Sequence, residues 1–130
     1  MKMLADRMEG QNAIARHGPE GVVVGGVEHT HSVIVPWRGK VTAWDAENFE
    51  ALTADHFVRL AALAPEVVIF GSGARIRFPP PALIQALIKA RIGIETMDSA
   101  AACRTYNVLY AEGRSVVAGL LFAPATAGRF

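Results

Sequence analysis

One short apolar run constrains the fold of this chain more than any other feature of the sequence. The run is Val67–Phe70, and it ends at Gly71. A wholly apolar run of this length is typical of a strand covered on both faces, as in a parallel sheet with helices packed on it. A second strand is predicted over Ile94–Met97. We expect the two strands to be parallel and joined by a right-handed crossover.

Apolar residues at helical spacing predict a helix before the first of these strands and another after it. The first covers Thr53–Ala64, with Thr53 as its N-cap, and Pro65 stops it. The second is opened by the triple proline Pro79–Pro81, because the first turn of a helix needs no N–H donors from its residues. Gly93 is expected to close this second helix.

A last helix and a last strand complete the second half of the chain. Asp98 can cap a helix over Ser99–Glu112, and Gly113 marks its C-terminal end. Val116–Phe122 predicts the last strand, whose direction the pattern leaves open. Strand and helix alternate through this half, which indicates an α/β layer with a βαβαβ order.

The first half of the chain has a β-rich pattern instead. Residues 1–20 show no sustained period and are interpreted as an irregular lead-in, with a short helical turn near Leu4–Met8 as one option. Two strands, 22–24 and 27–35, flank the dipeptide Gly25–Gly26 and predict a β-hairpin. A further short strand is predicted over Val41–Trp44. We expect one domain over residues 1–130, with a folded core over about 21–124 and an antiparallel β layer in its first half.

Composition narrows the classes of function. The chain has 130 residues, with 13 Lys and Arg against 12 Asp and Glu, which gives no overall basic field for nucleic acid. Cys103 is the single cysteine, so there is no intrachain disulfide, and a reducing compartment is favoured. The mean hydropathy of +0.27 hints at apolar surface that meets a partner.

Targeting and membrane signals are also missing from the sequence. The opening residues mix charges into what would be the apolar stretch of a secretory signal. No uncharged apolar window reaches the length of about 18 residues that a spanning helix needs. We therefore expect a cytoplasmic, prokaryotic protein without a transmembrane segment, and attachment to a membrane through a partner stays open.

Two loops are expected to meet where the parallel strands end. One loop is Gly71–Arg77 and the other is 97–99. Ligands of open α/β sheets collect at this edge, where glycines let backbone approach and helix N-termini present N–H groups to anions. One reading is an anion or phosphate site, with charge from Arg75 and Arg77. The other reading is a tight turn in which Asp98 only caps its helix. This reading is favoured because the dinucleotide fingerprint is incomplete: Ile76 stands at the position of its third glycine.

Other reactive side chains are also open to two readings. Cys103 follows the start of the last helix and is beside Arg104, and both features lower the pKa of a thiol, so a reactive thiolate is one reading. The other reading is a small buried core thiol. His29 and His31 are two residues apart and could bind one metal. A third and a fourth ligand are not evident, and His17 and His56 are candidate ligands only by elimination. We therefore expect no metal and no cofactor.

An aromatic and basic cluster lies between residues 37 and 44, formed by Trp37, Arg38, Lys40 and Trp44. Interleaved aromatic and basic side chains can bind nucleic acid. This cluster is short and the chain is nearly neutral, so core packing or a protein interface is the better interpretation. We expect no nucleic-acid partner.

Two segments resemble a known family. They are Phe70–Arg75 with Phe78–Pro79, and Gly93–Ser99 running into Ala102–Asn107 and 112–114. Their combination is similar to the family of domains of unknown function that includes the mitochondrial NADH:ubiquinone oxidoreductase (complex I) assembly factor 3. The resemblance covers about Gly21 to Phe122, and its most specific part is Ala102–Asn107. Ser72 and Ser99 stand where relatives often carry threonine, which keeps the hydroxyl.

The resemblance implies a fold and a kind of function. The fold is a three-layer α/β arrangement with a central mixed sheet and an additional β layer. The mitochondrial members are not enzymes, and they bind another assembly factor while the respiratory complex is built. Because no mitochondrial presequence precedes the domain, a prokaryotic member is implied. The positions that match the family's pattern are Gly71, Gly73, Arg75, Asp98, Cys103, Arg104, Thr105 and Asn107.

We therefore carry two main hypotheses into the structure. The first is a non-enzymatic protein-interaction module whose partner is a respiratory or membrane-complex subunit or another assembly factor. The second is a small-molecule or anion-binding protein, including an unassigned enzyme, with its site at the same edge of the sheet. A third reading puts the function elsewhere, for instance on the sheet of residues 27–44. The candidate binding residues are Gly71, Ser72, Gly73, Arg75, Arg77, Asp98, Ser99, Cys103, Arg104, Thr105 and Asn107.

Overall fold

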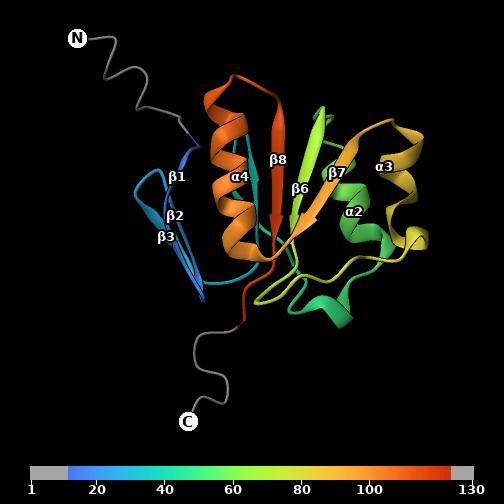
Figure 1. Cartoon of the computed structure of the whole chain (residues 1–130), viewed down its shortest axis with the longest axis horizontal. Coiled ribbons are helices and arrows are strands. Elements are labelled where there is room, and N and C mark those ends of the chain that lie inside the picture. The colour runs from blue at the N-terminus through green and yellow to red at the C-terminus, as the bar shows by residue number, and fades with distance from the viewer. Residues whose placement is uncertain (1–11, 124–130) are drawn as a thin grey trace.

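A central mixed sheet organises the computed structural model, which describes residues 12–123 (Figure 1). Its strands are β4 (Val33–Pro36), β5 (Thr42–Ala43), β6 (Val67–Gly71), β7 (Gly93–Met97) and β8 (Val116–Leu120), in the spatial order β5-β4-β8-β6-β7. β6 is parallel to both β7 and β8, whereas β4 is antiparallel to β8 and β5. The parallel pair predicted from the sequence is confirmed, and the last strand is parallel to it.

Three helices pack on this sheet, together with short 3₁₀ turns. The α-helices are α2 (Ala54–Ala61), α3 (Gln85–Lys89) and α4 (Ser99–Ala111), and the 3₁₀ turns are η1 (Phe49–Ala51) and η2 (Pro81–Ile84). Thr53 and Asp98 are the N-caps of α2 and α4, as the sequence predicts. No helix between residues 12 and 123 combines the length and apolarity that a membrane crossing requires.

Two helix ends differ from the sequence predictions. α2 ends at Ala61 rather than Ala64, and Ala64 has a left-handed backbone with φ of 54°. The triple proline opens a 3₁₀ turn, η2, with Pro81 as its first residue, and α3 follows this turn. α3 then ends at Lys89, and Gly93 is the first residue of β7 rather than the end of the helix.

A separate antiparallel sheet forms from the first part of the chain. It consists of β1 (Ile14–Gly18), β2 (Gly21–Val24) and β3 (Val27–His29), and the hairpin at Gly25–Gly26 is confirmed. The prediction of an irregular lead-in over 1–20 is wrong for β1. Of its five residues only Ile14 is buried, so the strand has no apolar alternation to reveal it. The option of a turn near Leu4–Met8 lies outside the described residues.

The predicted long strand 27–35 is in fact two strands in two different sheets. β3 ends at His29, the chain bends at His31, and β4 begins at Val33 in the central sheet. The sequence does not predict this break, because strand-forming residues continue through it and β propensity does not indicate which sheet a residue joins. The strand predicted over Val41–Trp44 is the shorter β5.

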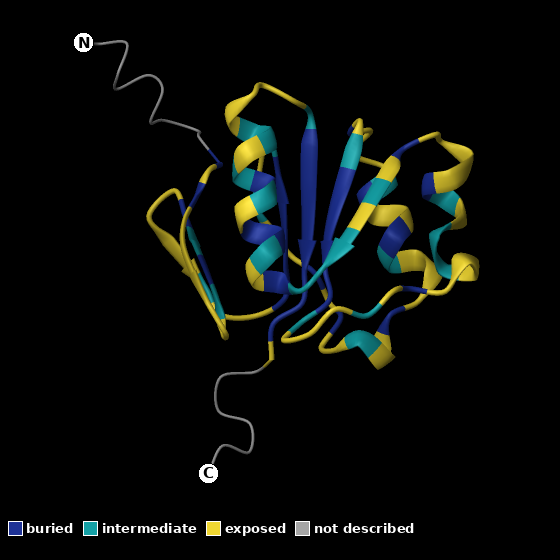
Figure 2. Ribbon diagram, in the orientation of Figure 1, coloured by how far each residue is buried: buried dark blue, intermediate teal, exposed yellow. Residues whose placement is uncertain are grey.

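The elements stack in three layers. Figure 1 shows α4 and the β1–β3 sheet on one side of the central sheet, with α2 and α3 on the other. Two apolar clusters fill the two interfaces, one containing Ile69 and Tyr106 and the other containing Phe57 and Phe70. β8 is buried along its whole length between them (Figure 2). This arrangement confirms the expected α/β fold with an additional β layer.

Candidate functional site at the carboxyl ends of the parallel strands

Gly71 lets the start of α4 approach the end of β6. A Cβ atom built on Gly71 would lie 2.9 Å from Leu120 Cδ2, 2.9 Å from Ser99 Oγ and 3.0 Å from Ser99 Cα. Real Cβ atoms do not tolerate such contacts without movement of their neighbours. The glycine is therefore required by packing, and it brings the loop after β6 against the N-terminus of α4.

Two buried serine hydroxyls hold this edge together. Ser72 Oγ donates to the Arg75 carbonyl at 2.8 Å and accepts from the Arg77 N–H at 2.9 Å. Ser99 Oγ donates to the Leu121 carbonyl at 2.7 Å and accepts from the Gly73 N–H at 2.9 Å. Both hydroxyls form these hydrogen bonds with backbone groups, so their role is to fix the shape of the loop.

Asp98 acts as the cap of α4. Its Oδ1 accepts from the Ala101 N–H at 2.8 Å, and the Ser99 N–H donates to the Gly73 carbonyl at 2.8 Å. The first turn of the helix is therefore largely satisfied by the protein itself, and its N-terminus carries a carboxylate. This arrangement is unfavourable for binding a further anion.

The two arginines of the loop have different surroundings. Arg77 pairs with Glu50 at 2.7 Å and lies over the Phe49 ring, 4.2 Å from its centroid. The hydrogen bond from Arg77 holds the pKa of Glu50 below its usual range. Arg75 is exposed, and no carboxylate of residues 12–123 lies within ion-pair distance of it. Arg77 thus anchors the loop, and Arg75 is available to a partner.

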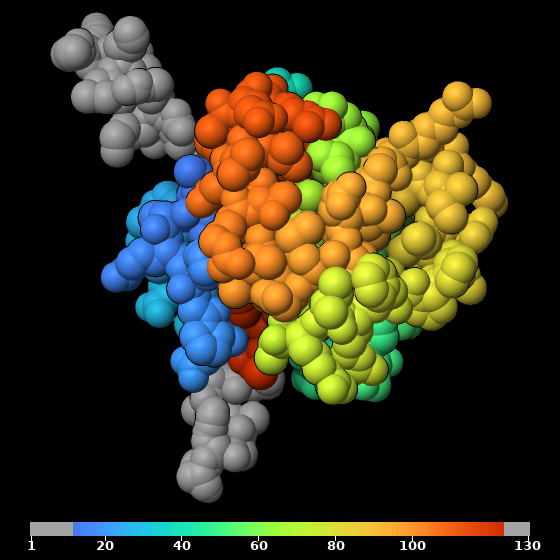
Figure 3. All heavy atoms as spheres, viewed as in Figure 1, coloured from blue at the N-terminus to red at the C-terminus, as the bar shows by residue number. Residues whose placement is uncertain are grey.

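The anchored loop presents apolar side chains to solvent. Phe78 is 69% exposed and Ile76 is 49% exposed, while Pro79 between the loop and η2 is buried. In Figure 3 this segment forms a yellow-green prominence on the visible face. We call Arg75, Ile76 and Phe78 the loop patch.

Two pockets flank Gly73 and Ala74. One has a volume of about 440 Å³ and lies between this loop, the start of α4, the β1–β2 turn and the chain after β8. The other, about 350 Å³, is lined by Glu50, Arg75 and Arg77 among others. His17 and Pro19 also line the first pocket. The sequence does not predict this, because no local pattern indicates that the β1–β2 turn reaches this edge of the sheet.

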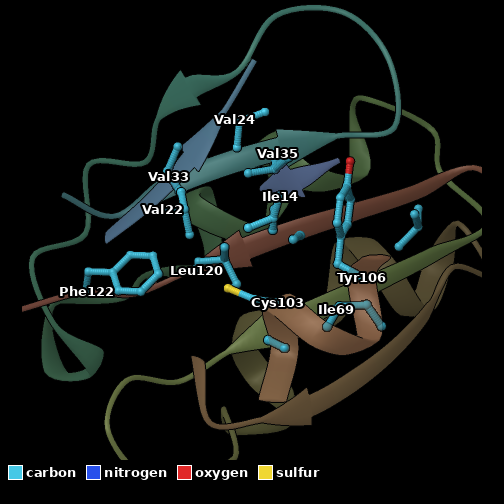
Figure 4. Close-up of a cluster of buried hydrophobic side chains, with 13 residues drawn as sticks. Ile14, Val22, Val24, Val33, Val35, Ile69, Cys103, Tyr106, Leu120 and Phe122 are labelled. Atoms are coloured by element: carbon cyan, nitrogen blue, oxygen red, sulfur yellow. The ribbon is translucent and has the colours of Figure 1, made fainter. Parts of the chain in front are cut away.

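Cys103 and Asn107 serve the fold rather than an exposed site. Cys103 is fully buried, and Figure 4 shows its sulfur among apolar side chains between α4 and the sheet. Burial raises the pKa of its thiol to about 12, so the reading as a small core thiol fits the structure and a reactive thiolate does not. The amide of Asn107 binds both backbone groups of Ile14. Of the other α4 candidates, Arg104 is exposed and Thr105 is half-buried.

His29 and His31 lie close together, with ring centroids 6.0 Å apart in an edge-to-face arrangement. Burial, and to a smaller extent the neighbouring His31, lowers the pKa of His29. Within residues 12–123, no group of three or more His, Cys, Asp or Glu side chains is arranged to hold a metal ion. The pair therefore lacks further protein ligands in the described part of the chain.

Comparison with known proteins identifies relatives. The model of a family described as "Protein of unknown function (DUF498/DUF598)" matches residues 14–121. The 13 kDa major membrane protein of Francisella tularensis is 31% identical over 90 residues, which cover 68% of this chain and 73% of that protein. The human NADH dehydrogenase [ubiquinone] 1 alpha subcomplex assembly factor 3 is 33% identical over 86 residues, which cover 65% of this chain and 47% of that protein. The chain thus spans about half the length of the assembly factor, and the resemblance to that family is confirmed.

Solved structures have the same fold. A crystal structure of a Bordetella parapertussis protein superposes with a TM-score of 0.81 at 35% identity, covering 86% of this chain and 96% of that one. The solution NMR structure of a Bordetella pertussis protein, described as a Mth938-like domain, gives a TM-score of 0.79 at 28% identity and covers 89% of each chain. The mixed α/β architecture is therefore shared with these proteins.

Proposed function

The chain belongs to the family of proteins of unknown function DUF498/DUF598, and from that premise we propose that it is a non-enzymatic protein-interaction module that acts as an assembly factor. Relatives named as complex I assembly factor 3 support this role. The partner is a respiratory or membrane-complex subunit or another assembly factor. The proposed docking site is the carboxyl edge of the sheet, with the loop patch at its centre.

The loop patch supports a protein partner because it is both anchored and exposed. Ser72, Arg77 and the buried Pro79 fix the backbone of the loop from within. An anchored loop loses little conformational entropy on binding, which favours affinity. An exposed aromatic side chain beside an arginine is the composition typical of interface hot spots. The exposure of Phe78 is the single observation that carries this proposal.

The experiment is a pull-down from native lysate of the source cells with quantitative mass spectrometry. We compare the wild-type chain, the Arg75→Ala/Phe78→Ala variant and the control variant Arg16→Ala/Val27→Ala. The control removes an exposed arginine and an exposed apolar side chain from the β1–β3 sheet instead. We expect the control to recover the same partner as the wild type and the loop variant to lose it. Equal recovery by both variants would show that the loop patch is not the docking site.

The proposed setting is the cytoplasm of a prokaryote, beside a membrane complex to which a protein partner attaches the chain. The name of the Francisella tularensis relative, a major membrane protein, supports an association with a membrane. Fractionation of cells tests this setting. Chain that pellets with membranes and is released by high salt fits attachment through a partner, whereas chain that stays in the membrane fraction after alkaline extraction contradicts it.

The pocket beside Gly73 supports a second candidate, the binding of a small molecule. Its volume of about 440 Å³ lies within the range of ligand pockets, and its lining is mostly apolar. Because Asp98 contributes a carboxylate to the lining, a neutral, largely apolar ligand fits this pocket better than the anion considered from the sequence. Native mass spectrometry of the purified chain tests this candidate: a retained metabolite of defined mass supports it, and a mass equal to that of the chain alone counts against it.

A further inference from the structure

The two sheets protect their edges unequally. Helix α4 covers the start of β1 with side chains that bind the backbone there. The Asn107 amide accepts from the Ile14 N–H at 2.8 Å and donates to the Ile14 carbonyl at 2.9 Å. Two residues earlier, the Asn12 N–H donates to Tyr110 Oη at 3.0 Å, and Tyr106 Oη donates to the Asn12 carbonyl at 3.0 Å. Three side chains of α4 therefore bind the backbone at the start of β1 and two residues before it.

The outer edge of β7 has no such cover. The Gly93 N–H donates to the Glu66 carbonyl, and the Met97 carbonyl accepts from the Ser72 N–H, so residues 93 and 97 bond inward toward β6. Because bonding alternates along a strand, Ile94 and Thr96 direct their N–H and C=O groups outward. In residues 12–123 no hydrogen bond reaches these four groups, which we call the open edge.

The open edge is accessible in the folded chain. Among the strands of residues 12–123, β7 is the last in the order of its sheet and pairs only with β6. Figure 3 shows atoms of β7 at the surface, between α4 and α3, on the same face as the loop after β6. The C-terminal end of β7 contacts that loop through the bond between Met97 and Ser72. The open edge and the loop patch therefore belong to adjoining surfaces.

We propose that the open edge of β7 binds an extended segment of a partner protein as an additional strand, and that this segment carries a lysine or arginine facing Glu95. Unpaired edge groups are a template for such strand addition. Glu95 lies at the centre of β7, is exposed, and forms no ion pair with any residue of the described range 12–123. Opposite charges on directly facing strand residues stabilise a pair of strands.

Charge favours this occupant over a second copy of the chain. Two β7 strands that pair antiparallel about Glu95 would place their two carboxylates opposite each other. Like charges in that position destabilise strand pairing. The inference rests on the proposed function, because it names the form of the partner segment, but it involves a different set of residues from the loop patch.

The test uses a displayed library of random dodecapeptides as the probe. Peptides are selected on the wild-type chain, and the binding of each selected peptide to the Thr96→Pro variant is then measured. Proline at 96 deletes an outward N–H and leaves the inward bonds of β7 to β6 intact. Thr96→Ala is the matched control, because it also loses the hydroxyl but keeps the N–H. Melting curves establish that the three proteins are folded.

We expect selected peptides to carry Lys or Arg at one position and to bind wild type and Thr96→Ala equally. Binding to Thr96→Pro should be about tenfold weaker, because one backbone hydrogen bond is lost and the adjacent hydrogen bonds are displaced. Equal binding of the selected peptides to Thr96→Pro, or no peptide selected on the wild-type chain, overturns the proposal. Loss of capture by the loop variant in the pull-down is a separate result, so the two proposals fail independently.

Three further measurements test the proposal, and the first two do not need Thr96→Pro to fold. Glu95→Lys should weaken the same peptides about fivefold, and replacing their basic residue by glutamate should restore binding. Hydrogen exchange at the Ile94 and Thr96 amides should slow when a peptide is added. Unchanged exchange at both amides overturns strand addition. A wild-type dimer in light scattering that Thr96→Pro converts to a monomer would identify a second copy as the occupant and overturn the partner proposed here.

Discussion

The side-chain amide of Asn107 on α4 binds both backbone groups of Ile14 on β1, with the N–H 2.8 Å from Oδ1 and the carbonyl 2.9 Å from Nδ2. A side-chain amide carries an acceptor oxygen and a donor nitrogen side by side, so it can bind both backbone groups of one residue. The contact joins the β1–β3 sheet to the helix across 93 residues of sequence. Asn107 therefore has a structural role in attaching the additional β layer.

Replacing Asn107 by alanine should destabilise the fold by about 2 kcal/mol, since two hydrogen bonds to partly buried backbone groups are lost. Chemical denaturation measures the free energy of unfolding. Arg104→Ala, on the exposed side of the same helix, is the control and should change that free energy by less than about 0.5 kcal/mol. An Asn107→Ala variant as stable as Arg104→Ala would mean that solvent replaces the amide without cost.

Glycine at 71 should be far less replaceable than glycine at 18. Gly71→Ala places a methyl group 2.9 Å from Leu120 Cδ2 and from Ser99 Oγ, and overpacking of this kind costs about 1–3 kcal/mol. At Gly18 a Cβ would meet nothing within 4 Å. Thermal melting of the two alanine variants distinguishes the sites. We expect a clear fall in melting temperature for Gly71→Ala and little change for Gly18→Ala, and the reverse order would contradict the close approach of α4 to β6.

The fold was predictable where local sequence determines it. Val67–Phe70 is apolar on both faces because helices cover both sides of β6, so its pattern alone predicts a buried parallel strand. The cap at Asp98 was predictable for the same reason, since a cap and its helix are neighbours in sequence. β1 was not predictable, because its edge is satisfied by Asn107, a residue far away along the chain.

The candidate site was predictable in place but not in detail. Parallel strands bring Gly71 and Met97 to the same edge, which the topology requires. Which face of α4 turns inward depends on how the helix docks, so the sequence could not tell that Cys103 is buried while Arg104 is exposed. The contacts of Arg77 could not be predicted from the sequence either, because Glu50 and Phe49 come from another part of the chain.

The ion pair between Arg77 and Glu50 should be visible in a titration of the Glu50 carboxyl. The pKa of Glu50 is lowered, first by its hydrogen bond with Arg77. A lowered pKa in the folded state means that the contribution of the pair is present above the unfolded pKa and is lost as the pH falls through the folded one. NMR of the side-chain carboxyl measures the midpoint. We expect the midpoint to rise more in Arg77→Gln than in Arg75→Gln, because Arg77 contributes the hydrogen bond that is the largest cause of the shift and Arg75 contributes only its charge. Equal rises in the two variants would contradict a dominant hydrogen bond from Arg77.

The same Arg77→Gln variant should loosen the loop patch. Hydrogen exchange at the amides of residues 74–78 should accelerate, because the anchor over Phe49 is lost while the bond of Ser72 to the Arg77 N–H remains. Exchange in β8 should be unaffected, which provides an internal control. Unchanged exchange in the loop would show that Ser72 and Pro79 hold it without the arginine.

Cys103 should make the stability of the fold depend on pH in the alkaline range. Burial raises the pKa of its thiol from 9.0 to about 12. For a raised pKa the folded state binds the proton more tightly, so the stabilisation is complete below pH 9 and is lost progressively as the pH rises toward 12. Denaturation at a series of pH values should show a fall in the free energy of unfolding that is shallower in Cys103→Ala, whose absolute stability is itself lower because a cavity remains. A thiol reagent at pH 8 should label the native chain slowly and the denatured chain fully. Fast labelling of the native chain, or identical pH profiles for wild type and Cys103→Ala, would contradict a protonated thiol sealed between α4 and the sheet.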